Sequence, residues 1–190
     1  MSIRIEVGAG RRVRPGYLRV DIRDLPDLYA RAPADNLPFE DASVTEVYSR
    51  HVLEHFGLRE AVDVLLEWRR VLEPGGTVYI IVPNLIWHLH QVVSGSHDSF
   101  YSKTSGKNDR YWGMGSIFGW QQDAHDYHKF GYWPELLTDL LLACGFDAPQ
   151  DLTNSPESLE RAPWHLEMRA VRGDAIRDPD RFRNLLDVKH

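Results

Sequence analysis

Two acids and two glycines near the amino terminus, Glu6, Gly8, Gly10 and Asp21, have the types and the spacing of a nucleoside-binding turn. Apolar residues alternate with polar ones over residues 3–7, which predicts a strand, and glycines at its end allow a turn whose backbone comes close to a ligand. A second short strand is expected over residues 17–20, just before Asp21. Because an acid at such a strand end can accept hydrogen bonds from ribose hydroxyls, the pattern predicts a nucleoside site at the carboxyl edge of a parallel sheet.

The same stretch argues against a dinucleotide site. That site needs Gly-x-Gly-x-x-Gly at the start of a helix whose N-terminus binds a pyrophosphate, whereas this chain offers only Gly8-Ala9-Gly10. The residues up to Gly16 are too few for a crossover helix, and Pro15-Gly16 interrupts them. A nicotinamide-dependent oxidoreductase is therefore disfavoured. The carboxylate of Glu6 suits a ligand with a cationic amino-acid tail, and a purely structural glycine turn is the alternative.

The Glu6-x-Gly8-x-Gly10 pattern with Asp21 downstream resembles motif I of the class I S-adenosylmethionine-dependent methyltransferases. The resemblance implies S-adenosyl-L-methionine as the cofactor. It also implies that Glu6, Gly8 and Gly10 line the methionine end of the cofactor and that Asp21 binds the ribose.

A second stretch, LPFEDASVTEVYSRHVLEHF from Leu37 onward, extends this resemblance. In the family an acid-Leu-Pro-Phe loop borders the adenine, which implies that Asp35, Asn36 and Leu37 contact it. In relatives the acid stands three or four residues before the leucine, whereas Asp35 stands two before Leu37, so an Asx turn is the alternative role for Asp35. A strand is predicted over residues 44–49. The His-x-Leu-Glu-His run that follows it implies that His51 and His55 bring polar groups to the sulfonium methyl, with His51 also among the cofactor contacts.

The next elements follow in the order that the family shows. Apolar residues at spacings of three and four predict an amphipathic helix over residues 57–72, which Pro74-Gly75-Gly76 ends. A nearly all-apolar run over 78–82 predicts a strand buried on both faces, followed by Pro83-Asn84. Enzymes that methylate amino groups of DNA or protein carry an Asn/Asp-Pro-Pro-Tyr type of loop after the fourth strand. This chain has Ser-Arg-His-Val at 49–52, which disfavours that subclass.

Aromatic residues concentrate between residues 85 and 132, which we interpret as a lid inserted after the fifth strand. A polar loop is expected over 94–108 and an aromatic, glycine-rich segment over 111–122. A lid at the carboxyl edge of the sheet can shape an acceptor pocket and exclude water, and its aromatic faces suit a sugar or another ring. The alternatives are that these side chains cap an apolar edge or form a homodimer contact.

Within this lid, His125 and His128 lie in a run that resembles the family's Asp-x-His-x-x-Gly segment. Either imidazole could accept the proton of an acceptor hydroxyl, with Asp123 or Asp126 as an orienting partner. Together with His51 and His55, they are the candidate catalytic residues. A metal site is disfavoured because the His-x-x-His spacing does not give the helical i, i+4 pair and no third ligand is evident. A histidine hydrogen-bonded to a loop carbonyl is the alternative for both residues.

Length, charge and cysteine content bound the function further. The chain has 190 residues, enough for one domain, and 22 basic against 28 acidic residues give a net charge of −6, which disfavours nucleic acid as a partner. The single cysteine, Cys144, fits a reducing compartment. There is no apolar run of membrane-spanning length and no signal-like segment, so we expect a cytoplasmic protein with no membrane contact.

We therefore expect an α/β protein with the three-layer Rossmann-like methyltransferase fold, built on a mostly parallel sheet with an antiparallel C-terminal strand and a degenerate first crossover helix. A helix over 133–143 and strands over 146–152 and 164–171 complete the methyltransferase domain at 1–172, and a tail or short helix follows over 173–190. The expected reaction is S-adenosylmethionine-dependent methyl transfer to oxygen of a small molecule or sugar. A non-catalytic S-adenosylmethionine- or nucleoside-binding regulatory module is the alternative.

Overall fold

The computed structural model describes residues 2–94 and 109–186 of the chain. The polar loop expected over 94–108 lies outside these residues except for Ser94, and so does the end of the tail or short helix expected over 173–190.

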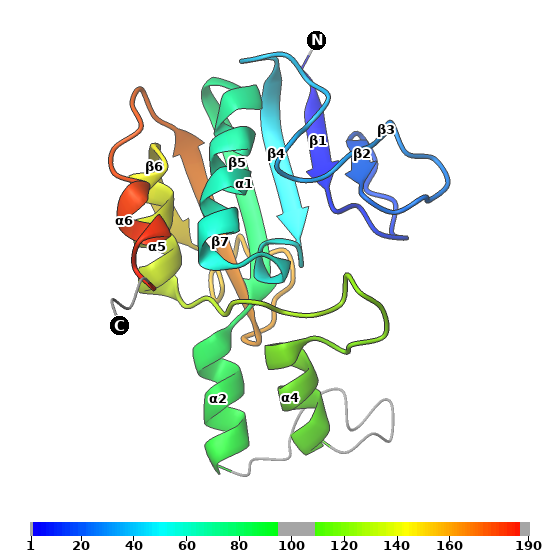
Figure 1. The fold of residues 1–190 in the computed structure, drawn as a ribbon, viewed down its shortest axis with the longest axis vertical. Coiled ribbons are helices and arrows are strands. Elements are labelled where there is room, and N and C mark those ends of the chain that lie inside the picture. Colours follow the sequence, from blue (N-terminus) through cyan, green and yellow to red (C-terminus); the bar gives the residue numbers. More distant parts are fainter. Residues whose placement is uncertain (1, 95–108, 187–190) are drawn as a thin grey trace.

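A seven-stranded sheet organises the molecule, in the order β3-β2-β1-β4-β5-β7-β6 (Figure 1). The strands β1 to β5 run parallel to their neighbours, β7 is antiparallel to β5, and β6 is antiparallel to β7. This arrangement confirms the expected fold class. The strands are β1 (Arg4–Val7), β2 (Leu18–Asp21), β3 (Ala30–Arg31), β4 (Val44–Arg50), β5 (Leu72–Pro83), β6 (Phe146–Asp151) and β7 (His165–Arg172).

One face of the sheet carries the main core and a layer of helices, α1 (Leu58–Val71), α5 (Pro134–Ala143) and α6 (Asp180–Arg183). Helix α1 forms because its apolar residues recur every three or four positions and all turn towards the sheet. The backbone N–H of Gly57 donates to Glu60 Oε2 at 2.8 Å, which satisfies a donor at the helix start. Trp68, fully buried, also donates from Nε1 to the Ala34 carbonyl and so ties the helix to the loop before β4.

Loops, not helices, cover the opposite face in the part of the chain that the structure describes. Only residues 8–17 connect β1 to β2, and they contain no helix, as the sequence predicted. A small second core of Tyr48, Tyr79, Ile81 and Leu152 lies on this face. Tyr17 packs against this core, and the Arg14 guanidinium lies 3.7 Å from the centre of the Tyr48 ring. The layer expected here is therefore built from the 8–17 loop and from the loop between β6 and β7.

The segment after β5 leaves the sheet and returns to it. Helices α2 (Leu85–Ser94) and α4 (Asp109–Phe118) pack against each other beyond the end of β5 (Figure 1). Asn84 pairs with Tyr132 in an isolated parallel bridge, so the chain comes back to the point where it left. The helices of this segment were not predicted from the sequence, because glycines and aromatic side chains obscure the helical period of α4.

Candidate functional site

The glycine turn closes the carboxyl end of β1 against β2. Gly8 and Gly10 both have positive φ angles, +69° and +60°, which glycine adopts without steric cost. A Cβ atom on Gly8 would lie 2.1 Å from Val52 Cγ2, so this backbone is packed directly under the segment that follows β4. The N–H groups of Gly8 and Ala9 donate to the Val20 carbonyl at 2.9 and 3.1 Å. The turn is thus fixed by its conformation, by its packing and by its hydrogen bonds.

Asp21 lies buried at the end of β2, and both of its carboxylate oxygens are occupied. Oδ2 accepts the Gly10 N–H at 2.9 Å and Arg23 Nη2 at 3.0 Å, and Oδ1 accepts the N–H of Arg23 at 2.9 Å and its Nε at 3.0 Å. Burial tends to raise the pKa of Asp21, but the hydrogen bonds from Arg23 and Gly10 outweigh it and lower the pKa. Asp21 is therefore a charged acceptor, which a half-exposed arginine side chain covers.

Glu6 presents a different environment from that of Asp21. Its side chain is buried, Oε1 lies 3.9 Å from Arg14 Nε, and Oε2 has no hydrogen-bond partner among the described residues. Burial raises the pKa of Glu6, against the opposing effect of Arg14. A buried acceptor without a donor costs about 1–3 kcal/mol, so this oxygen can accept a donor from a ligand beside the glycine turn.

The loop before β4 holds the three residues predicted at the adenine. Asp35 and Asn36 are exposed, whereas Leu37 is buried. The N–H of Leu37 donates to Glu67 Oε1 at 2.6 Å, and the N–H of Asn36 donates to the Pro33 carbonyl at 3.3 Å. The backbone N–H groups of Asn36 and Leu37 therefore already donate within the protein and are not free to donate to an adenine. The exposed side chains of Asp35 and Asn36 are the groups that this loop offers to a ligand.

A histidine cluster forms where β4 ends, around Glu54 of the short 3₁₀ helix η1 (Leu53–His55). His51 Nδ1 lies 2.9 Å from Glu54 Oε1, and His128 Nε2 lies 4.0 Å from the same oxygen. The His55 and His128 rings meet edge to face at 4.9 Å. Three of the four predicted catalytic histidines thus come together. His125, the fourth, is an exposed residue on the loop after α4.

The lid backbone, and not an aspartate, orients two of these rings. His55 Nδ1 lies 3.1 Å from the Tyr127 carbonyl, and His128 Nδ1 lies 2.9 Å from the Ser116 carbonyl. The aspartates expected to do this bond backbone groups instead, since Asp123 accepts the N–H of His125 and Asp126 accepts that of Gln122. The sequence could not show that carbonyls take the place of the aspartates, because every residue has a backbone carbonyl.

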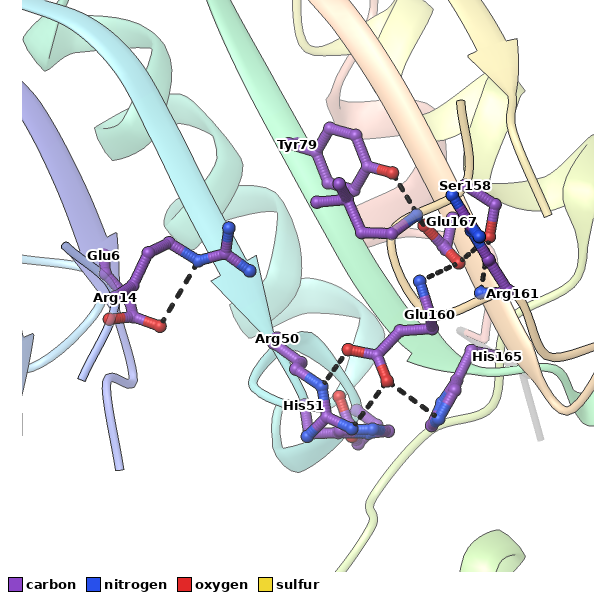
Figure 2. A network of polar contacts seen from close by, with 12 residues as sticks. Glu6, Arg14, Arg50, His51, Tyr79, Ser158, Glu160, Arg161, His165 and Glu167 are labelled. Atoms are coloured by element: carbon purple, nitrogen blue, oxygen red, sulfur yellow. Dashed lines mark hydrogen bonds and ion pairs between the residues drawn. The ribbon is translucent and has the colours of Figure 1, made fainter. Parts of the chain in front are cut away.

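The sequence analysis missed an ion pair that borders the cluster (Figure 2). Arg50 at the end of β4 donates to both oxygens of Glu160 at 2.7 and 3.1 Å, and His165 Nε2 lies 3.6 Å from Glu160. The His165 and His51 rings are 4.9 Å apart. Burial and the nearby His51 lower the pKa of His165 to about 3, so this imidazole is neutral at pH 7.

A buried carboxylate fixes the loop that carries Glu160. Glu167 on β7 is fully buried and accepts hydrogen bonds from the Tyr79 hydroxyl at 2.6 Å and from the N–H groups of Leu159 and Glu160 at 2.8 and 3.0 Å (Figure 2). The loop between β6 and β7 is therefore anchored to the sheet before it reaches the histidines. This anchor explains how a long irregular loop can place Glu160 reproducibly.

The segment between β5 and α5 lines a small cavity beside the cluster. A cavity between Glu54, His88, Ser116, His128 and Phe130 has room for about one water molecule. Burial lowers the pKa of His88 to about 4 and also lowers that of His128, so both rings favour the neutral form at pH 7. The arrangement provides neutral imidazoles and a buried carboxylate at the sheet edge next to the glycine turn.

Comparisons with known proteins agree with this architecture. The sequence profile of a family described as methyltransferase domain matches residues 15–80. No curated protein sequence matches the chain. Among solved structures, the chain resembles a CurJ carbon methyltransferase with a TM-score of 0.57 and 17% identity, over 91% of this chain and 49% of that one. The chain thus spans about half the length of the CurJ structure.

Two further structures cover more of both chains. A 1,6-didemethyltoxoflavin-N1-methyltransferase from Burkholderia thailandensis, solved with 1,6-didemethyltoxoflavin and S-adenosylhomocysteine bound, has a TM-score of 0.57 and 16% identity over 91% of this chain and 72% of that one. An S-adenosylmethionine-dependent methyltransferase from Mesorhizobium loti has a TM-score of 0.55 and 17% identity over 90% of both chains. At these identities the likeness shows the fold. Within the described residues, no helix combines the length and the apolar character that a membrane crossing requires.

Proposed function

We propose that this chain is a class I S-adenosylmethionine-dependent methyltransferase, which its fold and the family match over residues 15–80 support, and that it transfers a methyl group to an oxygen of a small molecule or sugar. One observation carries the proposal. The unpartnered Glu6 Oε2, the glycine turn and the buried Asp21 lie together at the carboxyl edge of β1 and β2. The histidine cluster lies at the end of β4, the strand next to β1.

The residues of this edge fit S-adenosylmethionine. Glu6 would accept from its ammonium group, the turn at Gly8 and Gly10 would lie against its methionine end, and Asp21 would bind the ribose. Asp35 and Asn36 are the side chains available for the adenine, and His51 is the polar group nearest to the reacting end. S-adenosylmethionine, when bound, supplies a methyl group that is already activated on a sulfonium. The chain's own contribution is then to orient the acceptor and to exclude water.

The acceptor side of the proposal rests on His51, His55 and His128. The neutral His128 ring, whose Nδ1 bonds the Ser116 carbonyl, has Nε2 available to take a proton from an acceptor hydroxyl. His125 stays a candidate only if the lid moves, because its side chain is exposed here. The complex of the Burkholderia thailandensis enzyme with a small heterocycle supports a small molecule as the acceptor of this chain, and the lid is suited to cover one.

Calorimetric titration with S-adenosylmethionine, S-adenosylhomocysteine and NAD in parallel tests the cofactor. We expect micromolar binding of the first two and none of NAD. Asp21→Ala should weaken binding about 5- to 150-fold, because about 1–3 kcal/mol of ribose hydrogen bonding is lost. Asp24→Ala, which removes an exposed acid three residues away, is the matched control and should leave the affinity unchanged. Equal affinities for wild type and Asp21→Ala would refute the site.

A panel of sugars and phenols, with product mass as the readout, tests methyl transfer. A mass gain of one methyl group on an oxygen would support the proposal, and transfer to nitrogen or carbon would refute its acceptor part. The second candidate function is a regulatory module that binds the cofactor without turnover. The Arg23 side chain that covers Asp21 and the absent crossover helix favour it, and tight binding without transfer to any acceptor would support it.

A further inference from the structure

Glu54, His55 and His128 each present one potential ligand atom, and these atoms all lie within 4.8 Å of one another. They come from two segments far apart in the sequence, the 3₁₀ helix after β4 and the loop after α4. The sequence analysis weighed a metal site only within residues 123–128 and found no third ligand there. The structure supplies one from elsewhere in the chain, since Glu54 completes a set of two imidazoles and one carboxylate.

Both imidazoles are oriented as metal ligands are. A carbonyl oxygen can only accept, so the contacts of His55 Nδ1 with Tyr127 and of His128 Nδ1 with Ser116 place the ring proton on Nδ1 in each neutral ring. The lone pair is then on Nε2. A metal-bound histidine commonly donates its other N–H to a carbonyl or carboxylate, which fixes the tautomer and the ring orientation. The lid backbone provides that second contact for both rings.

Glu54 has an oxygen to give. Its side chain is 1% exposed, and Oε1, which lies 2.9 Å from His51 Nδ1, is also 4.0 Å from His128 Nε2. Oε2 has no hydrogen-bond partner among the described residues, so the carboxylate can turn either oxygen to an ion. A buried carboxylate oxygen without a partner is costly unless a cation or a donor meets it.

We propose that Glu54, His55 and His128 bind one divalent transition-metal ion of the zinc type, with His51 holding the carboxylate in place. Two histidines and a glutamate with an open fourth position form a known catalytic zinc donor set, and imidazole ligands favour zinc, copper, iron or nickel over magnesium and calcium. At metal–ligand distances of about 2.0–2.2 Å the three atoms must approach to roughly 3.4 Å from one another. The 4.0 Å between His128 Nε2 and Glu54 Oε1 must therefore shorten by about 0.6 Å, and the partly exposed His55 must move towards both.

The open position would face the acceptor side of the site. If the proposed methyl transfer is correct, the ion would replace His128 as the activating group, because Nε2 of His128 is then a ligand and no longer a base. An acceptor hydroxyl bound to the ion would lose its proton to solvent more readily, because the ion stabilises the alkoxide. Only this consequence rests on the proposed function. Ion binding itself is independent of the cofactor and is tested without it.

The test uses the tag-free chain, stripped with a chelator and checked for folding by circular dichroism. Co²⁺ is titrated into it with visible absorption as the readout, Zn²⁺ is then added in competition, and elemental analysis gives the stoichiometry. We expect one ion per chain, intense absorption typical of four-coordinate Co²⁺, and displacement by Zn²⁺. His55→Ala and His128→Ala should each lower the affinity at least about 100-fold, more than the 10- to 100-fold typical of outer-shell changes.

His125→Ala is the matched control, since it removes an exposed histidine from the same lid loop and should leave Co²⁺ binding unchanged. Glu54→Gln keeps the volume of the side chain and removes its charge, so it should also abolish the Co²⁺ spectrum in a folded chain. The proposal would be overturned if the folded wild type failed to bind Co²⁺, or if His55→Ala and His128→Ala bound Co²⁺ as tightly as the wild type does. Either result would leave S-adenosylmethionine binding to be judged by its own titration.

Discussion

The carboxyl edge of the sheet has two halves, the glycine turn after β1 and the histidine cluster after β4. They differ in how far apart their residues lie in the sequence. The glycine-turn half takes Glu6, Gly8, Gly10 and Asp21 from a short stretch of sequence. Its acid Asp21 has both oxygens occupied, whereas Oε2 of its other acid, Glu6, has no partner among the described residues. The histidine half takes its residues from β4, η1, the lid and the loop before β7, and its acid Glu54 has an oxygen with no partner among the described residues. A local motif can be fixed by its own turn, whereas a distributed cluster depends on every segment that carries it.

The largest expected effect is on the local half, at Gly8. Gly8→Ala places a Cβ 2.1 Å from Val52 Cγ2 at a φ of +69°, so overpacking and backbone strain together should lower the free energy of unfolding by about 2–4 kcal/mol. Gly75→Ala is the control, because Gly75 has a φ of +77° but no atom within 4 Å of the added Cβ. Urea unfolding of both variants measures the difference.

Gly75→Ala should lower the free energy of unfolding by only about 1 kcal/mol, because alanine adopts this positive φ less readily than glycine but meets no neighbouring atom. Adding Val52→Ala to Gly8→Ala removes the opposing methyl groups and should restore part of the loss that Gly8→Ala causes. If the two glycine substitutions lowered the free energy of unfolding equally, the close packing of Gly8 against Val52 would have no effect on stability.

The next effect belongs to the distributed half and concerns pH. The folded-state pKa of His165 is lowered to about 3, so between this value and about 6.5 the unfolded chain binds a proton that the folded chain does not. Stability should therefore fall as the pH is lowered from 6.5, by about 2 kcal/mol at pH 5 from this group alone. His165→Gln should make the free energy of unfolding depend less steeply on pH, by a slope that corresponds to at most one proton taken up on unfolding. Urea unfolding at pH 7, 6 and 5 measures this slope.

His88 remains in the His165→Gln variant and, with its pKa lowered to about 4, keeps its own share of the pH dependence. A slope identical to that of the wild type would show that His165 gains its proton as readily in the folded chain as in the unfolded one. The contact of His165 with Glu160 would then stabilise the charged ring enough to offset burial.

The same contrast decides what the sequence could predict. The strands over 3–7, 44–49 and 78–82, the helix over 57–72 and the missing crossover helix follow from periodicity and from the residue count between Gly8 and Tyr17, which are local properties. The motif at Glu6 and Asp21 is local too. Glu160 and His165 lie more than a hundred residues beyond His51, and nothing in their own neighbourhood marks them. The carbonyls of Ser116 and Tyr127 that orient His128 and His55 are invisible in a sequence, because every residue has one.

The smallest expected effect concerns the hydrogen bonds that Asp21 already makes with Arg23 in the absence of a ligand. Arg23 donates to both of its oxygens, and a ribose that uses them must first displace this half-exposed side chain. Because a surface ion pair is worth about 0–1 kcal/mol, Arg23→Ala should tighten S-adenosylmethionine binding by up to about fivefold. Arg11→Ala removes the same charge from an exposed position in the loop between β1 and β2, which controls for the general attraction of a cationic ligand to a less positive site. A gain in affinity confined to Arg23→Ala would show that the arginine competes with the ribose, whereas a loss would show that Arg23 itself belongs to the binding site.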